Sequence, residues 1–135
     1  MNDAPQIDLA RILATHAERP LLIDAPTGTV WTYADVQAIA TGLSRTWRHA
    51  GLERGARIAT LTQRRAPHAL LAYACMLNGY AFVPLPPDTA PDDLGLLLAR
   101  SRPARLYVDD ELLPRLDEAI AARQDGGDPL PAIER

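Results

Sequence analysis

Lysine is absent from the sequence, and all permanently charged cationic side chains are arginines. A Walker-type phosphate-binding lysine, a Schiff-base lysine and an ammonium general base are therefore excluded within these 135 residues. Cys75 is the one cysteine, so the chain has no internal disulfide framework and suits a reducing compartment. Its place in an apolar helical pattern predicts a buried, unreactive thiol.

Long apolar runs and basic clusters are also missing. No apolar stretch approaches the length of a membrane span, and the N-terminus lacks the features of a signal peptide. The net charge of −3 gives no basic footprint for nucleic acid or anionic membrane surfaces. With 47% hydrophobic and 23% charged residues, the composition is typical of a soluble globular protein, which we expect to be cytoplasmic.

The length and residue pattern predict one domain over residues 1–123, followed by a linker or disordered tail over 124–135. At the N-terminus, residues 7–17 favour a short helix and residues 21–31 a β-hairpin with a Pro/Thr/Gly turn. Thr32 and Asp35 have the spacing of a capping box. The helix that follows has apolar residues at intervals of three and four and should end at Gly51.

Strand and helix patterns alternate from residue 57 onward. This alternation predicts an α/β fold, with a parallel sheet between two layers of flanking helices and the N-terminal helix and hairpin packed on it. The predicted strands are 57–62, 80–83 and 105–108, and the predicted helices begin near Pro67, at Pro91 and after Asp110.

Residues 80–83 are almost wholly apolar, which favours a strand covered on both faces. Gly79 before them is typical of a helix end. Pro84 cannot donate a backbone hydrogen bond, so strand pairing is expected to fade there.

Catalytic and metal-binding motifs are scarce. The sequence has no HExxH, CxxC, GxSxG, GxGxxG or P-loop, and no catalytic or metal-ligating residue is predicted. The three histidines, His16, His49 and His68, lie far apart in the sequence, and a structural role is favoured for each. The acidic run 109–111 is compatible with a metal or acid–base cluster, but carboxylates at a helix start more often cap it.

Two segments fall at the carboxyl ends of predicted parallel strands, where open α/β sheets bind ligands. Arg64 and Arg65 precede a helix start and are candidates for binding an anion; the alternative is a solvated turn. Residues 86–89 could line a cleft at the same edge; the alternative is a plain loop.

Four segments together resemble the adenylate-forming, AMP-binding enzymes: acyl-CoA synthetases, fatty acyl-AMP ligases and the adenylation domains of nonribosomal peptide synthetases. They are WTYADV (31–36), AGLERGARIA (50–59), MLNGYAFVPL (76–85) and LLARSRPARLYVD (97–109). They are similar to that family's (L/F)(T/S)YxEL, LGVxxGDRVA, LKAGAAYVPL and LxDSxAxLLxTD patterns, in the same order. The resemblance extends over about residues 7–123 and implies the N-terminal subdomain of such an enzyme.

The resemblance implies that an intact relative activates a carboxylic acid with ATP and Mg²⁺ as an acyl-adenylate, and transfers it to coenzyme A or a carrier-protein phosphopantetheine. The family's phosphate loop and catalytic lysine lie later in its sequences, so no catalytic residue is carried over. This chain is therefore expected to contain no cofactor site of its own and to be inactive alone.

Some acyl-CoA synthetases use this region to contact the nucleotide end of coenzyme A. The positions that match those contacts are Pro86, Pro87 and Arg115; the alternative is an ordinary surface. In this segment Pro86-Pro87 replaces the family's common aspartate, which is somewhat similar to the proline-rich turn of fatty acyl-AMP ligases.

Two functions of different classes remain open. The chain is either the N-terminal part of a ligase, with the rest of the enzyme or a complementary chain as its partner, or a truncated, non-enzymatic module that docks a partner enzyme or carrier protein. An independent small enzyme is disfavoured because no nucleophile–base constellation is present.

Overall fold

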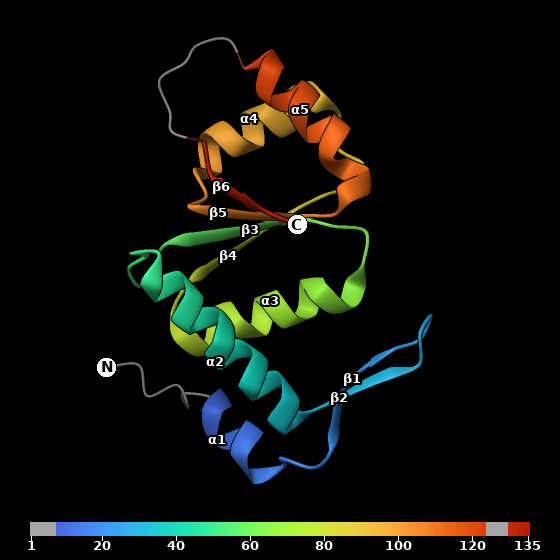
Figure 1. Cartoon of the computed structure of the whole chain (residues 1–135), viewed down its shortest axis with the longest axis vertical. Coiled ribbons are helices and arrows are strands. Elements are labelled where there is room, and N and C mark those ends of the chain that lie inside the picture. The colour runs from blue at the N-terminus through green and yellow to red at the C-terminus, as the bar shows by residue number, and fades with distance from the viewer. Residues whose placement is uncertain (1–7, 124–129) are drawn as a thin grey trace, which may run out of the picture.

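The computed structural model describes residues 8–123 and 130–135. The elements are α1 (Leu9–Thr15), β1 (Pro20–Asp24), β2 (Thr29–Thr32), α2 (Tyr33–His49), β3 (Arg57–Leu61), α3 (Arg65–Asn78), β4 (Ala81–Leu85), α4 (Pro91–Ser101), β5 (Arg105–Val108), η1 (Asp110–Leu112), α5 (Leu113–Ala122) and β6 (Ala132–Glu134). Within the described residues the main sheet has the parallel order β4-β3-β5-β6. Helices α2 and α3 cover one face, and α4 and α5 cover the other (Figure 1). The predicted α/β fold with flanking helices is confirmed.

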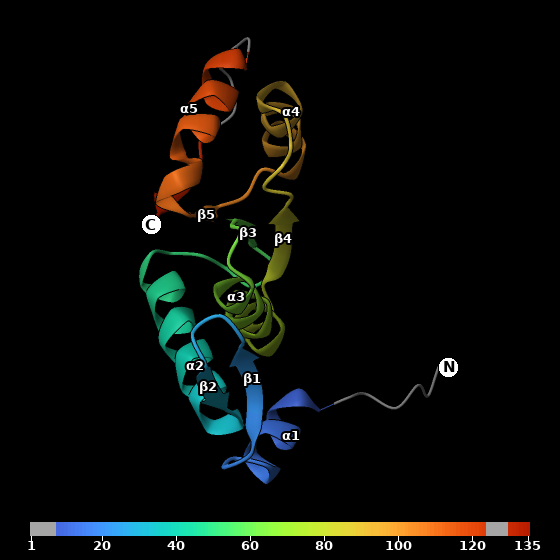
Figure 2. The same cartoon turned by 90° about the vertical axis from the view of Figure 1, so that its right-hand side faces the viewer.

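The N-terminal helix and hairpin were expected to pack on the sheet, but they pack mainly against α2 and α3, which lie between them and the sheet. Strands β1 and β2 pair antiparallel as a two-stranded sheet of their own, and the hairpin lies beside the start of α3 (Figures 1 and 2). The predicted capping box is present, with the Asp35 amide donating to Thr32 Oγ1 (3.2 Å) and the Thr32 amide donating to Asp35 Oδ2 (2.8 Å). The pKa of the Asp35 carboxyl is lowered by the bond from the Thr32 amide and, second, by a bond that the Thr32 hydroxyl donates to Asp35 Oδ2 (2.8 Å).

The central strand β3 is buried on both faces. Ala59 and Leu61 join the core under α4 and α5, whereas Ile58 joins the core under α2 and α3. Ile58, Ala59 and Leu61 are each 0% exposed. Because β3 pairs with strands on both sides, it is the strand around which the two helical layers are organised.

Strand β4 differs from the sequence prediction in its pairing. It is an edge strand of the described sheet, yet it is covered on both faces as expected, because Phe82 packs against the core under α2 and α3 and Val83 against the core under α4 and α5. Ala81 and Pro84 are exposed. Pairing with β3 continues through Pro84 to the end of the strand instead of fading. The Ala81 amide donates to Ala56 on the β3 side (3.0 Å). Since donor direction alternates along a strand, the nitrogen of Pro84 faces away from β3, where its missing hydrogen costs nothing.

The last residues extend the sheet. Residues 124–135 were expected to be a linker or disordered tail, of which 124–129 lie outside the described residues. In the described remainder, β6 pairs in parallel with β5, and Glu134 forms an ion pair with Arg105. The short strand was missed because a disordered end was favoured by the neighbouring Asp-Gly-Gly-Asp-Pro run. No helix in the described parts of the chain is long and apolar enough to cross a bilayer.

Candidate functional site

The carboxyl ends of β3, β4 and β5 lie at one edge of the sheet, and a cleft of about 630 Å³ opens there. Its lining joins the loop between β3 and α3, the start of α3 and the loop after β4. The lining residues are Thr62, Gln63, Arg64, Arg65, His68, Pro87 and Asp88. The two segments singled out in the sequence, at Arg64–Arg65 and at Pro87, are therefore two walls of one cleft.

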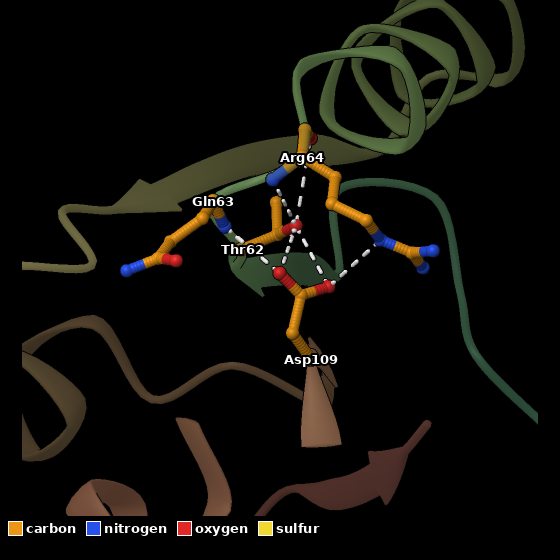
Figure 3. Close-up of polar contacts among 4 residues, drawn as sticks. All are labelled: Thr62, Gln63, Arg64 and Asp109. Carbon is orange, nitrogen blue, oxygen red and sulfur yellow. Dashed lines mark hydrogen bonds and ion pairs between the residues drawn. The ribbon is translucent and has the colours of Figure 1, made fainter. Parts of the chain in front are cut away.

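Asp109 joins the end of β5 to the loop after β3. Its carboxylate accepts hydrogen bonds from Thr62 Oγ1 (2.9 and 2.8 Å to the two oxygens), the Gln63 amide (2.9 Å) and Arg64 Nε (3.3 Å), as Figure 3 shows. The Asp109 side chain is only 10% exposed, whereas that of Arg64 is 73% exposed. The buried carboxylate is the hydrogen-bonding centre of the loop.

The predicted capping role of Asp109 is wrong. Its side chain makes no cap hydrogen bond to η1, because its carboxylate faces the loop after β3 instead. The neighbouring Asp110 and Glu111 are exposed in the first turn of η1. Across residues 8–123 and 130–135, no group of three His, Cys, Asp or Glu side chains could hold a metal ion.

The loop that leads into α3 is held by hydrogen bonds within the chain, whereas α3 itself has no side-chain cap at its start. Thr62 Oγ1 accepts from the Arg64 amide (3.0 Å), and Asp109 accepts from the Gln63 amide (2.9 Å). Pro67 in the first turn has no amide hydrogen to offer. Arg64 is paired with Asp109, while Arg65 is exposed and makes no hydrogen bond or ion pair within the described residues. Of the two candidate arginines, Arg65 is fully available to an anion, whereas Arg64 is available only through its Nη groups because its Nε is paired with Asp109.

His68 forms the floor beside these arginines. Its Nδ1 lies 3.2 Å from the hydroxyl of Thr60, which is fully buried on β3. Its ring also packs edge-on against Phe82, with ring centroids 5.0 Å apart. The imidazole is thus fixed from behind by a strand hydroxyl and from the side by an aromatic ring, which supports a structural role.

Arg115, the third position that the resemblance matched to a coenzyme A contact, bonds to the backbone of the loop that contains Pro86 and Pro87. Its Nη1 donates to the carbonyl oxygens of Pro87 (2.9 Å) and Thr89 (3.1 Å). Arg115 itself is half-buried and does not line the cleft. The arrangement makes it a support for the loop after β4.

A second cleft, of about 800 Å³, lies between the hairpin and α3. Its wall is mostly apolar, with Leu22, Trp31 and Leu70 among its lining residues. Gln63, Arg64 and Arg65 line both clefts, so the loop after β3 is the partition between them. Sequence reasoning missed this arrangement because the hairpin and α3 are far apart in the chain.

Cys75 takes no part in either cleft. It is fully buried in α3, and burial raises the pKa of its thiol to about 12. Since the thiolate is the reactive form, this thiol is unreactive at neutral pH, as predicted.

Comparison with known proteins explains the architecture. The model of a family described as AMP-binding enzyme matches residues 9–131. This chain belongs to that family. It is 30% identical over 106 residues to a 4-coumarate–CoA ligase-like protein of Oryza sativa subsp. japonica, which covers 78% of this chain and 17% of that protein. It is 35% identical over 85 residues to 4-coumarate–CoA ligase 1 of the same organism, covering 62% of this chain and 15% of the relative.

The fold is shared with solved AMP-binding enzymes. The luciferase-like enzyme of the nonluminescent Zophobas morio mealworm superposes with a TM-score of 0.78 at 17% identity, over 93% of this chain and 31% of that one. This chain therefore spans about a third of that structure, and about a sixth of the curated relatives. It corresponds to only part of a larger ligase.

Proposed function

We propose that this chain is the N-terminal part of an ATP-dependent ligase that activates a carboxylic acid as an acyl-adenylate, and that it performs no adenylation alone. The observation that carries this proposal is the family match over residues 9–131 in a chain that spans 17% of a relative with a ligase name. The acyl substrate and the thiol acceptor belong to the whole enzyme.

The residues present do not fit ATP and Mg²⁺. Stabilising the charge of a reacting triphosphate requires several positioned cations, whereas the sheet-edge cleft is lined by only two arginines and the chain has no lysine. Within the described residues, no cluster of carboxylates is suited to a metal ion. We therefore assign nucleotide activation to parts of the ligase outside this chain.

The cleft at the sheet edge does fit the nucleotide end of coenzyme A. Its volume of about 630 Å³ suits a small ligand, and the exposed guanidinium of Arg65 can meet a phosphate. Pro87 lines the opposite wall and Pro86 precedes it in the same loop, which keeps both candidates on the coenzyme A side. Arg64 contributes only in part, because its Nε is paired with Asp109.

The test of the main proposal is ATP–pyrophosphate exchange with a panel of aliphatic, aromatic and amino acids. The purified chain should give exchange at the background level of a reaction without protein. Exchange above that background that remains after contaminating proteins have been removed would contradict the proposal. A relative with ligase activity, assayed in parallel, serves as the positive control.

The alternative is a non-enzymatic docking module for a partner enzyme or carrier protein. The hairpin favours it, because Ile23 and Val30 are cross-strand partners that are 63% and 48% exposed. Light scattering should then detect self-association, or a dye that binds exposed apolar surface should bind the chain. The double variant Ile23→Ser and Val30→Thr should reduce either signal. A monomer that binds no dye, no carrier protein and no ligase chain would rule the alternative out.

A further inference from the structure

Both walls of the sheet-edge cleft are held from the same segment. The first wall is the loop Thr62–Arg65, which is tied to Asp109 directly after β5. The second wall is Pro87 and Asp88, whose loop is tied to Arg115 in α5. Asp109 and Arg115 lie within seven residues of one another in the sequence, whereas the walls come from two different strand–helix connections.

We propose that Asp109 and Arg115 are positioning residues that set the spacing of the two walls, and thereby the affinity of the cleft for the nucleotide end of coenzyme A. Neither residue lines the cleft. The choice of ligand rests on the proposed function, whereas the positioning of the walls rests on the hydrogen bonds alone.

Asp109 is suited to positioning and not to ligand binding. Its two oxygens already accept from a hydroxyl, a backbone amide and a guanidinium, and its side chain is nearly buried. A carboxylate also repels phosphate. The Thr62 hydroxyl donates to Asp109 and also accepts a hydrogen bond from the Arg64 amide. One carboxylate therefore determines the path of residues 62–64.

Arg115 supplies hydrogen bonds that the loop after β4 cannot make within itself. Pro86 and Pro87 have no amide hydrogens, and the local turn bond is donated by Thr89 to the Pro86 carbonyl (3.2 Å). The carbonyls of Pro87 and Thr89 are satisfied together by a single guanidinium nitrogen. Removing that nitrogen should release the second wall while leaving the first wall in place.

The segment that carries both ties is itself held firmly. Leu112 and Leu116 lie in the core under α4 and α5, at 5% and 0% exposure. A Cβ built on Gly95 of α4 would lie 2.8 Å from the carbonyl oxygen of Ala119, so the two helices are in close backbone contact there. Two ties from one rigid segment fix the two walls relative to each other.

Amide hydrogen exchange of the full, ligand-free chain tests the positioning role. Asp109→Asn should raise exchange about tenfold at the amides of residues 63–64 and leave residues 88–89 unchanged. Arg115→Met should do the reverse. Asp110→Asn and Arg45→Met, at exposed positions of the same residue types, should change neither loop.

Thr62→Val is the second variant for the first wall, because it removes one hydroxyl and keeps the Asp109 carboxylate. Arg115→Lys should restore protection of residues 88–89 in part, since an ammonium can reach one of the two carbonyls. Circular dichroism of each variant verifies the fold. Unchanged exchange in Asp109→Asn and Thr62→Val, or in Arg115→Met, would overturn the proposal.

A titration with coenzyme A separates this inference from the proposed function. Asp109→Asn and Arg115→Met should weaken binding about fivefold to tenfold without changing its dependence on salt, whereas Arg65→Met should weaken binding and reduce that dependence. A reduced salt dependence in Arg115→Met would mean that Arg115 touches the ligand, and would overturn its positioning role. If the unaltered chain does not bind coenzyme A, the assignment of coenzyme A as the ligand is overturned. The hydrogen-exchange results still test whether Asp109 and Arg115 position the two walls.

Discussion

The two faces of the main sheet are covered in different ways. Under α4 and α5 the buried residues are all aliphatic. Under α2 and α3 the core includes Trp47 and Tyr80, packed edge-on with ring centroids 4.9 Å apart. There Trp47 Nε1 donates to the Tyr107 hydroxyl (2.9 Å), and Tyr80 donates to the Leu52 carbonyl (3.3 Å).

This difference indicates how each layer is specified. An aliphatic core offers no directional bonds, so the position of α4 and α5 depends on close packing. The aromatic core also satisfies polar groups at fixed angles, which favours one orientation of α2 and α3. We therefore expect the face under α4 and α5 to be sensitive to changes in side-chain volume. The face under α2 and α3 should be sensitive both to volume and to the loss of hydrogen-bonding groups.

The largest effect should come from removing volume on the aliphatic face. Leu116→Ala deletes most of a fully buried side chain and should lower the free energy of unfolding by about 2–5 kcal/mol. Leu96→Ala on α4, where the leucine is 50% exposed, is the control and should cost less than about 0.5 kcal/mol. Urea titration measures both. Equal effects would show that α5 does not pack as described.

A pair of helix glycines compares the faces directly. Gly95→Ala should lower the free energy of unfolding by about 1–3 kcal/mol, because its new Cβ meets the Ala119 carbonyl oxygen at 2.8 Å. Gly42→Ala in α2 has nothing within 4 Å of the new Cβ and should instead raise stability by up to about 1 kcal/mol, from helix propensity. Thermal unfolding of the two variants should therefore shift in opposite directions.

Alkaline pH should affect the aromatic face, where the core holds a titratable thiol. Burial raises the pKa of Cys75 to about 12 from an ordinary value of 9.0, so folding favours the protonated thiol. The contribution of the protonated thiol to the free energy of unfolding is fully present below pH 9 and is lost as the pH rises from 9 towards 12. Stability should fall by about 1 kcal/mol by pH 10 through this group.

Cys75→Ala removes this titration. Its free energy of unfolding should decline less between pH 8.5 and pH 10 than that of the unaltered chain, as followed by urea titration at each pH. Burial also raises the pKa of the Tyr107 hydroxyl, so part of the alkaline decline should remain in the variant. Identical declines in the two proteins would contradict the assignment to Cys75.

Local patterns in the sequence were good predictors of the elements. The period of the helix from Tyr33, its Thr32–Asp35 cap and its end before Gly51 all depend on neighbouring residues, and all are present. The alternation of strands and helices likewise predicted the parallel sheet. The family resemblance depended on the same kind of local information and is confirmed by the match over residues 9–131.

The errors concern partners that are distant in the chain. Pairing was expected to fade at Pro84, because the apolar run 80–83 could not reveal that β4 has a neighbour on one side only within the described sheet. Asp109 was expected to cap its own helix, yet its donors come from residues 62–64, about 46 positions earlier. Whether a carboxylate caps locally or bonds across a sheet depends on which loop the fold places beside it.

By itself, the sequence determined the order of the elements, the ends of the helices and the membership of the AMP-binding family, because these follow from the spacing of apolar, capping and motif residues along the chain. Only the tertiary structure decided which residues meet at the sheet edge. The parallel strands bring Thr62, Pro87 and Asp109 to the same edge, and the hydrogen bonds that form there depend on geometry that no local pattern contains.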